Sequence, residues 1–195
     1  MTAADHELIR RCRRGEARAW EALVRSSTPL VYRLALRMLR DAGLADDATQ
    51  EVFLRMVRSF DSYDATRAFE PWLCRIAYHV CVRRLQGTTR RELNGATDEL
   101  SEEYQGQLTD IVEGAPADPE SAAAHREAVA MLEQGFAQLT PQDRGLLTLR
   151  YREGLSDAEV AEATQMAVNT VKSRIFRARA QLARHVRSSL GGDEP

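Results

Sequence analysis

Long apolar segments are missing from this chain of 195 residues: no run of about 18 apolar residues occurs that would cross a bilayer. The N-terminus lacks the apolar core of a signal peptide. The three cysteines, Cys12, Cys74 and Cys81, are an odd number without a CxxC pair, and the spacing of His79 and Cys81 is not that of a zinc site. We therefore expect a cytoplasmic protein with reduced thiols, no metal and no membrane insertion.

The chain also lacks the alternating apolar and polar residues of half-buried strands, and only 6% of it is aromatic. Apolar residues recur instead at helical spacing, so the predicted fold class is all-α. Helices are expected over residues 5–14, 16–26, 29–40, 45–60, 69–84, 118–138, 141–153, 156–164 and from residue 168 onward. Pro29 suits the first turn of its helix, and Thr140 is an N-cap candidate before Pro141.

The distribution of charge divides the chain, although the net charge is only −2. Residues 1–91 carry 17 Arg against 11 Asp or Glu, whereas residues 92–124 carry nine acidic residues and no Lys or Arg. Such a change in composition indicates domain boundaries. The predicted organisation is two small helical domains, 1–91 and 120–190, joined by an acidic flexible linker, 92–119, and followed by a tail, 191–195.

A helix-turn-helix pattern spans residues 155–186. Ser156 is a good N-cap and Glu159 follows three residues later, which is the form of a capping box. The first helix ends before residues 165–167, and the second begins at Val168 with apolar residues along one side. Residues 168–190 carry six Lys or Arg and no Asp or Glu. This pattern predicts that the second helix enters the DNA major groove.

A second candidate nucleic-acid surface lies on the helix predicted from residue 69. Arg75, His79, Arg83 and Arg84 lie away from its apolar stripe, and aromatic residues precede or begin the helix. Arginine beside aromatic rings suits single-stranded or melting DNA, because bases stack on rings while guanidinium groups hold phosphates. A structural role in the core is favoured for Trp72, and both roles stay open for Tyr63 and Phe69.

Three short motifs occur in a fixed order along the chain. The first is DATQEVFLR (Asp47–Arg55), the second is FEPWLCRIA (Phe69–Ala77), and the third pairs LTPQDR (Leu139–Arg144) with TVKSRIFRAR (Thr170–Arg179). An acidic segment follows the second motif. In this order the chain resembles the extracytoplasmic-function (ECF) sigma factors of bacterial RNA polymerase, and the similarity extends from about Glu7 to Leu190.

The resemblance implies a role for each candidate site. Docking on a coiled coil of core RNA polymerase would use Asp47, Gln50, Glu51 and Arg55. Recognition and melting of the minus-ten promoter element, with capture of a flipped base, would involve Tyr63, Phe69, His79, Arg83 and Arg84. Recognition of the minus-thirty-five element would involve Asn169, Thr170, Lys172, Ser173, Arg174, Phe176 and Arg177. The implied function is promoter-specific transcription initiation, with promoter DNA and an anti-sigma factor as further partners.

Three positions depart from the family pattern. His79 replaces the usual Asn where the non-template strand is handled, so the base preference at the minus-ten element is open. Gln165 stands where a turn Gly is common, and Ala167 stands where Ser often caps the second helix. The loss of that cap costs about 1 kcal/mol, which leaves the motif intact.

Two other function classes are consistent with parts of the sequence. A helix-turn-helix transcriptional regulator would bind DNA without being a polymerase subunit, but a response-regulator receiver needs alternating strands and helices, which are missing. A protein-interaction module would leave the basic helix unused. No catalytic constellation is visible, so we expect no enzymatic activity, no cofactor and no small-molecule substrate.

Overall fold

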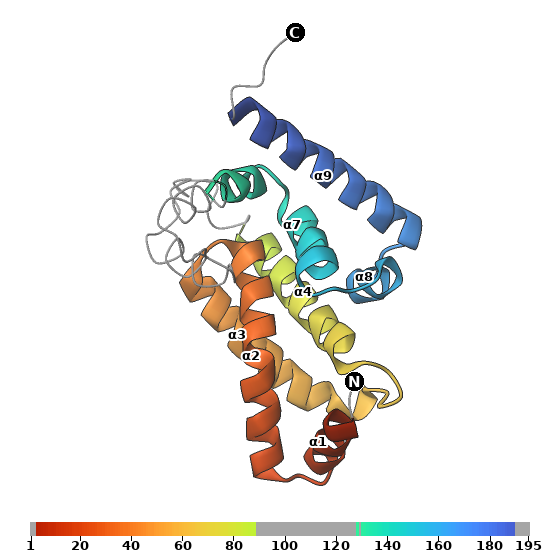
Figure 1. The fold of residues 1–195 in the computed structure, drawn as a ribbon. Helices are drawn as coiled ribbons and strands as arrows, with labels where there is room; N and C mark the ends of the chain where they lie inside the picture. Colours follow the sequence, from red (N-terminus) through yellow and green to blue (C-terminus); the bar gives the residue numbers. More distant parts are fainter. Residues whose placement is uncertain (1–2, 89–127, 129, 190–195) are drawn as a thin grey trace, which may run out of the picture.

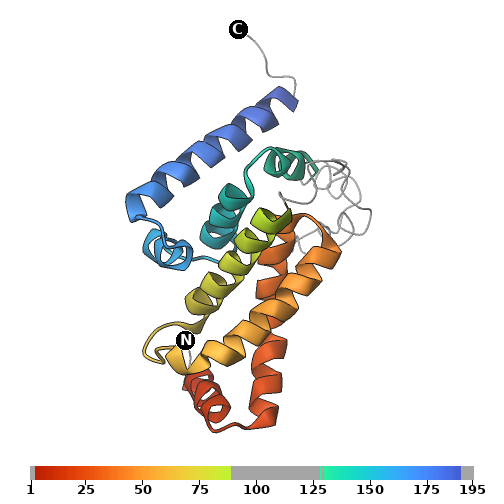
Figure 2. The same ribbon diagram turned by 180° about the vertical axis from the view of Figure 1, so that it is seen from behind.

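The computed structural model describes residues 3–88, 128 and 130–189, and all regular structure within these ranges is helical. The prediction of an all-α fold is confirmed. The N-terminal lobe consists of α1 (Ala3–Arg13), α2 (Ala17–Leu39), α3 (Ala42–Ser59), the 3-10 turn η1 (Phe60–Ser62) and α4 (Phe69–Thr88). These helices lie side by side in Figures 1 and 2, with α4 between the N-terminal helices and the rest of the molecule.

The helices predicted over residues 16–26 and 29–40 are one helix, α2, with Pro29 inside it, so the predicted break is wrong. Proline removes one backbone hydrogen bond. The Thr28 hydroxyl donates to the Val24 carbonyl at 2.8 Å, just before the proline. Residues on both sides of Pro29, such as Leu23 and Val31, are buried in the same core. Packing along the whole helix therefore outweighs the local cost of proline.

The start of α3 also differs from its prediction. Residues 41–43 were expected to be a break, but the helix begins at Ala42. Asp41 caps it, since its side chain accepts a hydrogen bond from the Leu44 amide at 2.7 Å. An N-cap aspartate satisfies an amide that the first helical turn leaves without a partner.

The C-terminal lobe contains a helix over residues 130–137, α7 (Pro141–Leu147), the π-helical turn η2 (Thr148–Arg152), α8 (Asp157–Thr164) and α9 (Val168–Ser189). The predicted starts at Thr140 and Ser156 are confirmed. Thr140 accepts from the Asp143 amide, and Ser156 and Glu159 form a complete capping box. Gly154 ends the segment after η2 with a φ of 71°, a left-handed conformation that glycine adopts without strain.

The two lobes pack directly against each other. Helix α4 contacts α7 and α8, and α2 contacts α7 and η2. The buried apolar side chains form one cluster that runs from Ile9 in α1 to Ala178 in α9. Gly145 marks a close approach of α7 to the N-terminal lobe, because a Cβ there would lie 3.0 Å from Met38 Sδ and 3.0 Å from Tyr78 Cε2.

Three sequence predictions concern residues that lie wholly or mostly outside this description. The acidic linker, 92–119, and the tail, 191–195, lie outside the described residues, as does most of the helix predicted over 118–138. None of the helices that are described combines the length and the apolar character needed to cross a membrane.

Candidate nucleic-acid interface

Helix α9 forms the outer edge of the C-terminal lobe in Figure 1, with α8 beside its first turns. Val171, Ile175 and Ala178 recur at helical spacing and are buried against the lobe. Val168, predicted for the same apolar side, is instead 39% exposed. The buried stripe orients the helix so that its opposite, basic face points to solvent, which is the requirement for insertion into a DNA groove.

Six of the seven residues predicted to contact the minus-thirty-five element are exposed on α9. They are Asn169, Thr170, Lys172, Ser173, Phe176 and Arg177. Phe176 is 73% exposed, the highest value among the large apolar side chains that the structure describes. Arg174 is different, because its Nε donates to Asp143 Oδ1 of α7 at 2.8 Å and its side chain is largely buried. In this conformation Arg174 therefore holds α9 to α7.

The aromatic residues predicted for the minus-ten element lie in the core of the N-terminal lobe. Tyr63 and Phe69 are 2% and 5% exposed. The centroids of these two rings are 5.5 Å apart, and the centroid of the Tyr63 ring lies 5.1 Å from that of Trp72. The Tyr63 hydroxyl donates to the Arg67 carbonyl at 2.6 Å, which closes the loop before α4. In this conformation neither ring is accessible to a DNA base.

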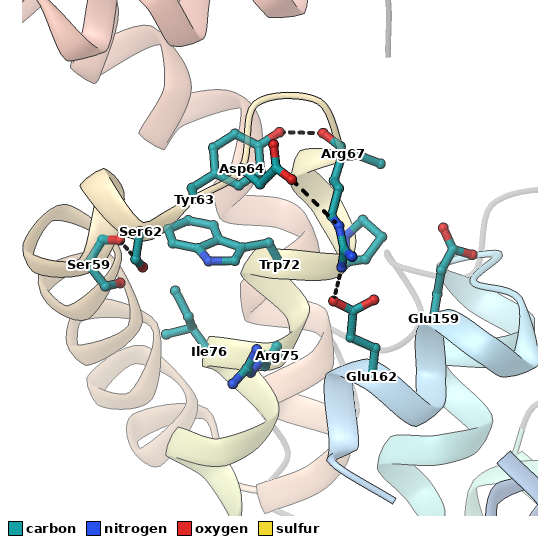
Figure 3. Close-up of a pocket in the computed structure, with 12 residues that line it drawn as sticks. Ser59, Ser62, Tyr63, Asp64, Arg67, Trp72, Arg75, Ile76, Glu159 and Glu162 are labelled. Carbon is teal, nitrogen blue, oxygen red and sulfur yellow. Dashed lines mark hydrogen bonds and ion pairs between the residues drawn. The ribbon is translucent and has the colours of Figure 1, made fainter. Parts of the chain in front are cut away.

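Beside this aromatic cluster lies a pocket of about 820 Å³ between the loop, α4 and α8. Figure 3 shows Arg67 pointing from the loop toward α8, where it pairs with Glu162. The side chains around the pocket combine aromatic, basic and acidic groups, among them Tyr63, Trp72, Arg67, Arg75, Glu159 and Glu162. Glu159 and Glu162 come from α8 of the C-terminal lobe, whereas Asp64 comes from the loop, so the pocket depends on the contact between the lobes.

Of the other residues predicted for the minus-ten element, Arg83 is exposed and His79 is partly buried on α4. Burial lowers the pKa of His79, and the nearby charge of Arg75 lowers it further. Both effects disfavour the imidazolium, so His79 presents a neutral imidazole at pH 7. Arg75, His79 and Arg83 follow one another at intervals of four residues, and therefore share one face of the helix.

The structure brings Arg84, assigned to minus-ten recognition, together with the predicted polymerase-docking residues. Its guanidinium lies 2.9 Å from Glu51 Oε2 and 3.6 Å from Asp47 Oδ2, and it also donates to the Asp47 carbonyl. Glu51 pairs in addition with Arg55 at 2.6 Å. Gln50 is exposed on the same helix, α3. Arg84 thus fixes α4 to the charged face of α3.

Two apolar residues on α3 were missed as candidates for docking. They are Leu54 and Val57, which are 59% and 53% exposed. They follow Gln50 at intervals of four and three residues, so all three lie on one face of the helix. Exposed apolar side chains next to charged ones are a common feature of protein interfaces. The intervals were visible in the sequence, but the amphipathic pattern alone did not distinguish these residues from core residues.

The three cysteines are free and buried among the helices. Burial raises the pKa of Cys81 to about 12 and also raises that of Cys74. These thiols are consequently poor nucleophiles. Over the described part of the chain, no three potential metal-ligating side chains lie together.

The capped α8, the turn and the exposed basic face of α9 define a DNA-binding protein of the helix-turn-helix class. Two family models match the chain: Sigma-70 region 2 over residues 23–91 and Sigma-70, region 4 over residues 130–182. The chain is 36% identical over 178 residues to the RNA polymerase sigma-H factor of Pseudomonas aeruginosa, covering 90% of both proteins. It is 32% identical to the ECF RNA polymerase sigma-E factor of Escherichia coli, again covering 90% of both.

The chain therefore belongs to the sigma-70 family, among the ECF sigma factors, and the resemblance inferred from the three motifs is confirmed. The alternative of a helix-turn-helix regulator outside this family is not favoured. Two solved structures share the fold. The first is CnrH in complex with the cytosolic domain of CnrY, with a TM-score of 0.63 and 22% identity, and the match covers 98% of this chain and 99% of CnrH. The second is the sigma factor RpoE in complex with the anti-sigma factor NepR from Bartonella quintana, with a TM-score of 0.60 and 18% identity, and the match covers 89% of this chain and 98% of RpoE.

Proposed function

We propose that this sigma factor binds core RNA polymerase and directs it to promoters through two separate DNA contacts. The observation that carries this proposal is the exposed, basic face of α9, mounted on a capped helix-turn-helix in a chain of the ECF family. Arginine and lysine contacts to phosphates supply affinity, and side chains at base edges supply specificity.

The docking surface on core polymerase comprises Asp47, Gln50, Glu51, Arg55, Leu54 and Val57 of α3. The charged members are ordered by Arg84, whose guanidinium pairs with both acidic side chains. Leu54 and Val57 contribute apolar area that is already exposed and loses water on binding. Charged groups around exposed apolar ones suit an association that must be both specific and reversible.

Two DNA contacts follow from the two lobes. The face of α9 formed by Asn169, Thr170, Lys172, Ser173, Phe176 and Arg177 binds the minus-thirty-five element. The N-terminal lobe binds and melts the minus-ten element through the loop before α4 and through His79 and Arg83, and Tyr63 and Phe69 take part once the loop rearranges. Arg84 acts by holding α4 against α3, rather than through a direct DNA contact.

Further features follow from the same assignment. The domain boundaries 1–91 and 120–190, with a linker between them, match two separate functions on one polymerase. RpoE is bound to the anti-sigma factor NepR and CnrH to the cytosolic domain of CnrY, which supports an anti-sigma factor as a regulatory partner of this chain. As a specificity subunit the chain performs no covalent chemistry, and its place of action is the cytoplasm, where the polymerase works.

The proposal is tested by adding the purified chain to bacterial core polymerase with a genomic template. Initiation at discrete start sites is expected, and it should be lost when Gln50, Leu54 and Val57 are all replaced by Ala. The matched control is Arg25→Ala, an exposed residue of α2 far from the docking surface in the sequence. DNA binding by the chain with no initiation on any template would favour the helix-turn-helix regulator instead.

A further inference from the structure

The loop before α4, residues 63–68, is held by a side chain from a distant part of the sequence. Arg13 is the last residue of α1, and its Nη2 donates to the Tyr63 carbonyl, 50 positions later in the chain. Tyr63 is the first residue of the loop, and its ring is one of those assigned to the melted minus-ten element. A side chain of α1 therefore binds the backbone of a residue whose ring is enclosed until the loop rearranges.

Helix α1 gives this contact a fixed support. Ile9 and Cys12 of α1 are each 2% exposed and belong to the common apolar core. The turn after the helix is closed by Glu16, whose carboxylate binds Arg11 at 2.7 Å and Arg14 at 2.9 Å. The C-terminal end of α1 is thus held in place, so a side chain that projects from this end starts from a defined position.

The amide, the carbonyl and the hydroxyl of Tyr63 all have partners in this conformation. The amide donates to the Phe60 carbonyl at 3.1 Å, and the hydroxyl donates to the Arg67 carbonyl at 2.6 Å (Figure 3). These two bonds are local, because they join residues three and four positions apart, and they can move with the loop. The bond from Arg13 comes from another helix, so it has to break when the Tyr63 backbone moves away from the core.

The charge of the loop strengthens its attraction to Arg13. Asp64 accepts hydrogen bonds from the amide and the hydroxyl of Thr66 at 3.0 and 2.7 Å, and these bonds lower the pKa of its carboxyl group. The positive charges of Arg67 and Arg13 lower this pKa further. Asp64 is consequently ionised at pH 7, and its carboxylate attracts the guanidinium of Arg13 toward the loop. A hydrogen bond from such a charged donor is also stronger than one between neutral groups.

We propose that Arg13 is a positioning residue for the minus-ten contact, which holds the loop in its enclosed conformation until the loop rearranges to receive an unpaired base. Only molecules in which the bond from Arg13 to Tyr63 is broken can bind that base, so the bond lowers the apparent affinity for melted DNA. This cost is the same for every promoter. Strongly bound minus-ten elements compensate for it, whereas weakly bound ones are disfavoured. The inference rests on the proposed function.

The first measurement follows hydrogen exchange of the amides of residues 63–67 in the full-length chain without polymerase. It compares the wild type with Arg13→Ala, Arg13→Lys and the control Arg10→Ala, since Arg10 is exposed on the same helix and pairs with Glu7. Exchange should be about threefold to tenfold faster in Arg13→Ala, the factor that corresponds to one hydrogen bond, and unchanged in the control. Arg13→Lys retains a charged donor and should stay close to the wild type. Circular dichroism should show equal helix content in all four proteins.

The second measurement uses holoenzyme formed with each of the four proteins. The probe is a single-stranded oligonucleotide of the non-template strand that spans the minus-ten element of a promoter mapped in the initiation assay. Holoenzyme with Arg13→Ala should bind the probe about threefold to tenfold more tightly, and its initiation should increase more at weakened minus-ten elements than at the parent promoter. Loss of a positive charge by itself weakens binding to DNA, so the expected effect has the opposite sign. Arg10→Ala reports the size of that charge effect.

Unchanged exchange in Arg13→Ala would overturn the inference, and so would faster exchange combined with equal or weaker binding of the oligonucleotide. Equal effects of Arg13→Ala and Arg13→Lys would also overturn it, because a retained donor would then make no difference. Failure of the wild-type chain to direct initiation at any start site would instead contradict the proposed function. The exchange rates would still decide in that case whether Arg13 holds the loop.

Discussion

The outer face of α9 and the loop before α4 carry the two sets of side chains assigned to promoter DNA, and they differ in how they are presented. On α9, Phe176 and Arg177 point to solvent with no change of structure required. In the loop, Tyr63 and Phe69 are packed among aromatic rings and α8 lies over the adjacent pocket. A surface that binds duplex DNA can be preformed, whereas one that captures an unpaired base needs to expose apolar rings only when a base is available to cover them.

The largest effect is expected from two phenylalanines that belong to these two surfaces. Phe69→Ala removes a buried ring and should lower the free energy of unfolding by about 3–5 kcal/mol. Phe176→Ala removes a ring that is 73% exposed and should change it by less than about 0.5 kcal/mol, while weakening promoter binding. Urea denaturation measures both values. Similar losses of stability in the two variants would contradict the difference in burial.

Two arginines of α9 also differ in role: Arg177 is exposed toward DNA, whereas Arg174 binds another helix of the protein. Arg177→Ala should reduce discrimination at the minus-thirty-five element by about 1–3 kcal/mol, measured as promoter preference of the holoenzyme, and should leave core binding unchanged. Arg174→Ala breaks the pair with Asp143 and should instead cost stability, by about 1 kcal/mol. An equal loss of core binding in Arg177→Ala would count against its assignment to DNA.

The capping box of α8 affects both surfaces, because α8 supports α9 and also covers the pocket beside the loop. Ser156→Ala removes the side chain that accepts from the Glu159 amide, and should destabilise the chain by about 1 kcal/mol. Hydrogen exchange should show faster opening of the first turn of α8. Ser156→Thr is the matched control, since threonine retains a capping hydroxyl. Unchanged exchange rates in Ser156→Ala would show that the cap contributes nothing there.

The smallest effect is expected at the turn between α8 and α9. Gln165 ends α8 with a φ of 57°, a left-handed conformation that is costly for any residue with a Cβ. Gln165→Gly should therefore raise the free energy of unfolding by roughly 0.5–1 kcal/mol, as seen by thermal or urea denaturation. Gln165→Ala retains the Cβ and should bring no gain. An equal gain from both substitutions would point to the glutamine side chain rather than the backbone.

Much of the fold and of the α9 surface could be predicted from local sequence. Caps at Thr140 and Ser156 act over three or four residues, and helical periodicity places Val171 and Ile175 opposite the DNA-facing residues. The unbroken α2 could not be predicted in this way, because Pro29 is tolerated only through packing against other helices. The exposure of Leu54 and Val57 could not be predicted either, because an amphipathic pattern does not show which apolar residues a neighbouring helix covers.

By itself the sequence determined the helical class, the helix-turn-helix and membership of the sigma family, because caps, periodicity and motifs are properties of neighbouring residues. Only the tertiary structure decided that Arg84 supports the docking face, that Tyr63 and Phe69 are enclosed, and that Arg33 and Arg37 meet Glu153 and Glu133. These partners lie from 33 to 120 positions apart in the chain. Their pairing depends on how the helices pack against one another, and no local pattern of residues specifies that arrangement.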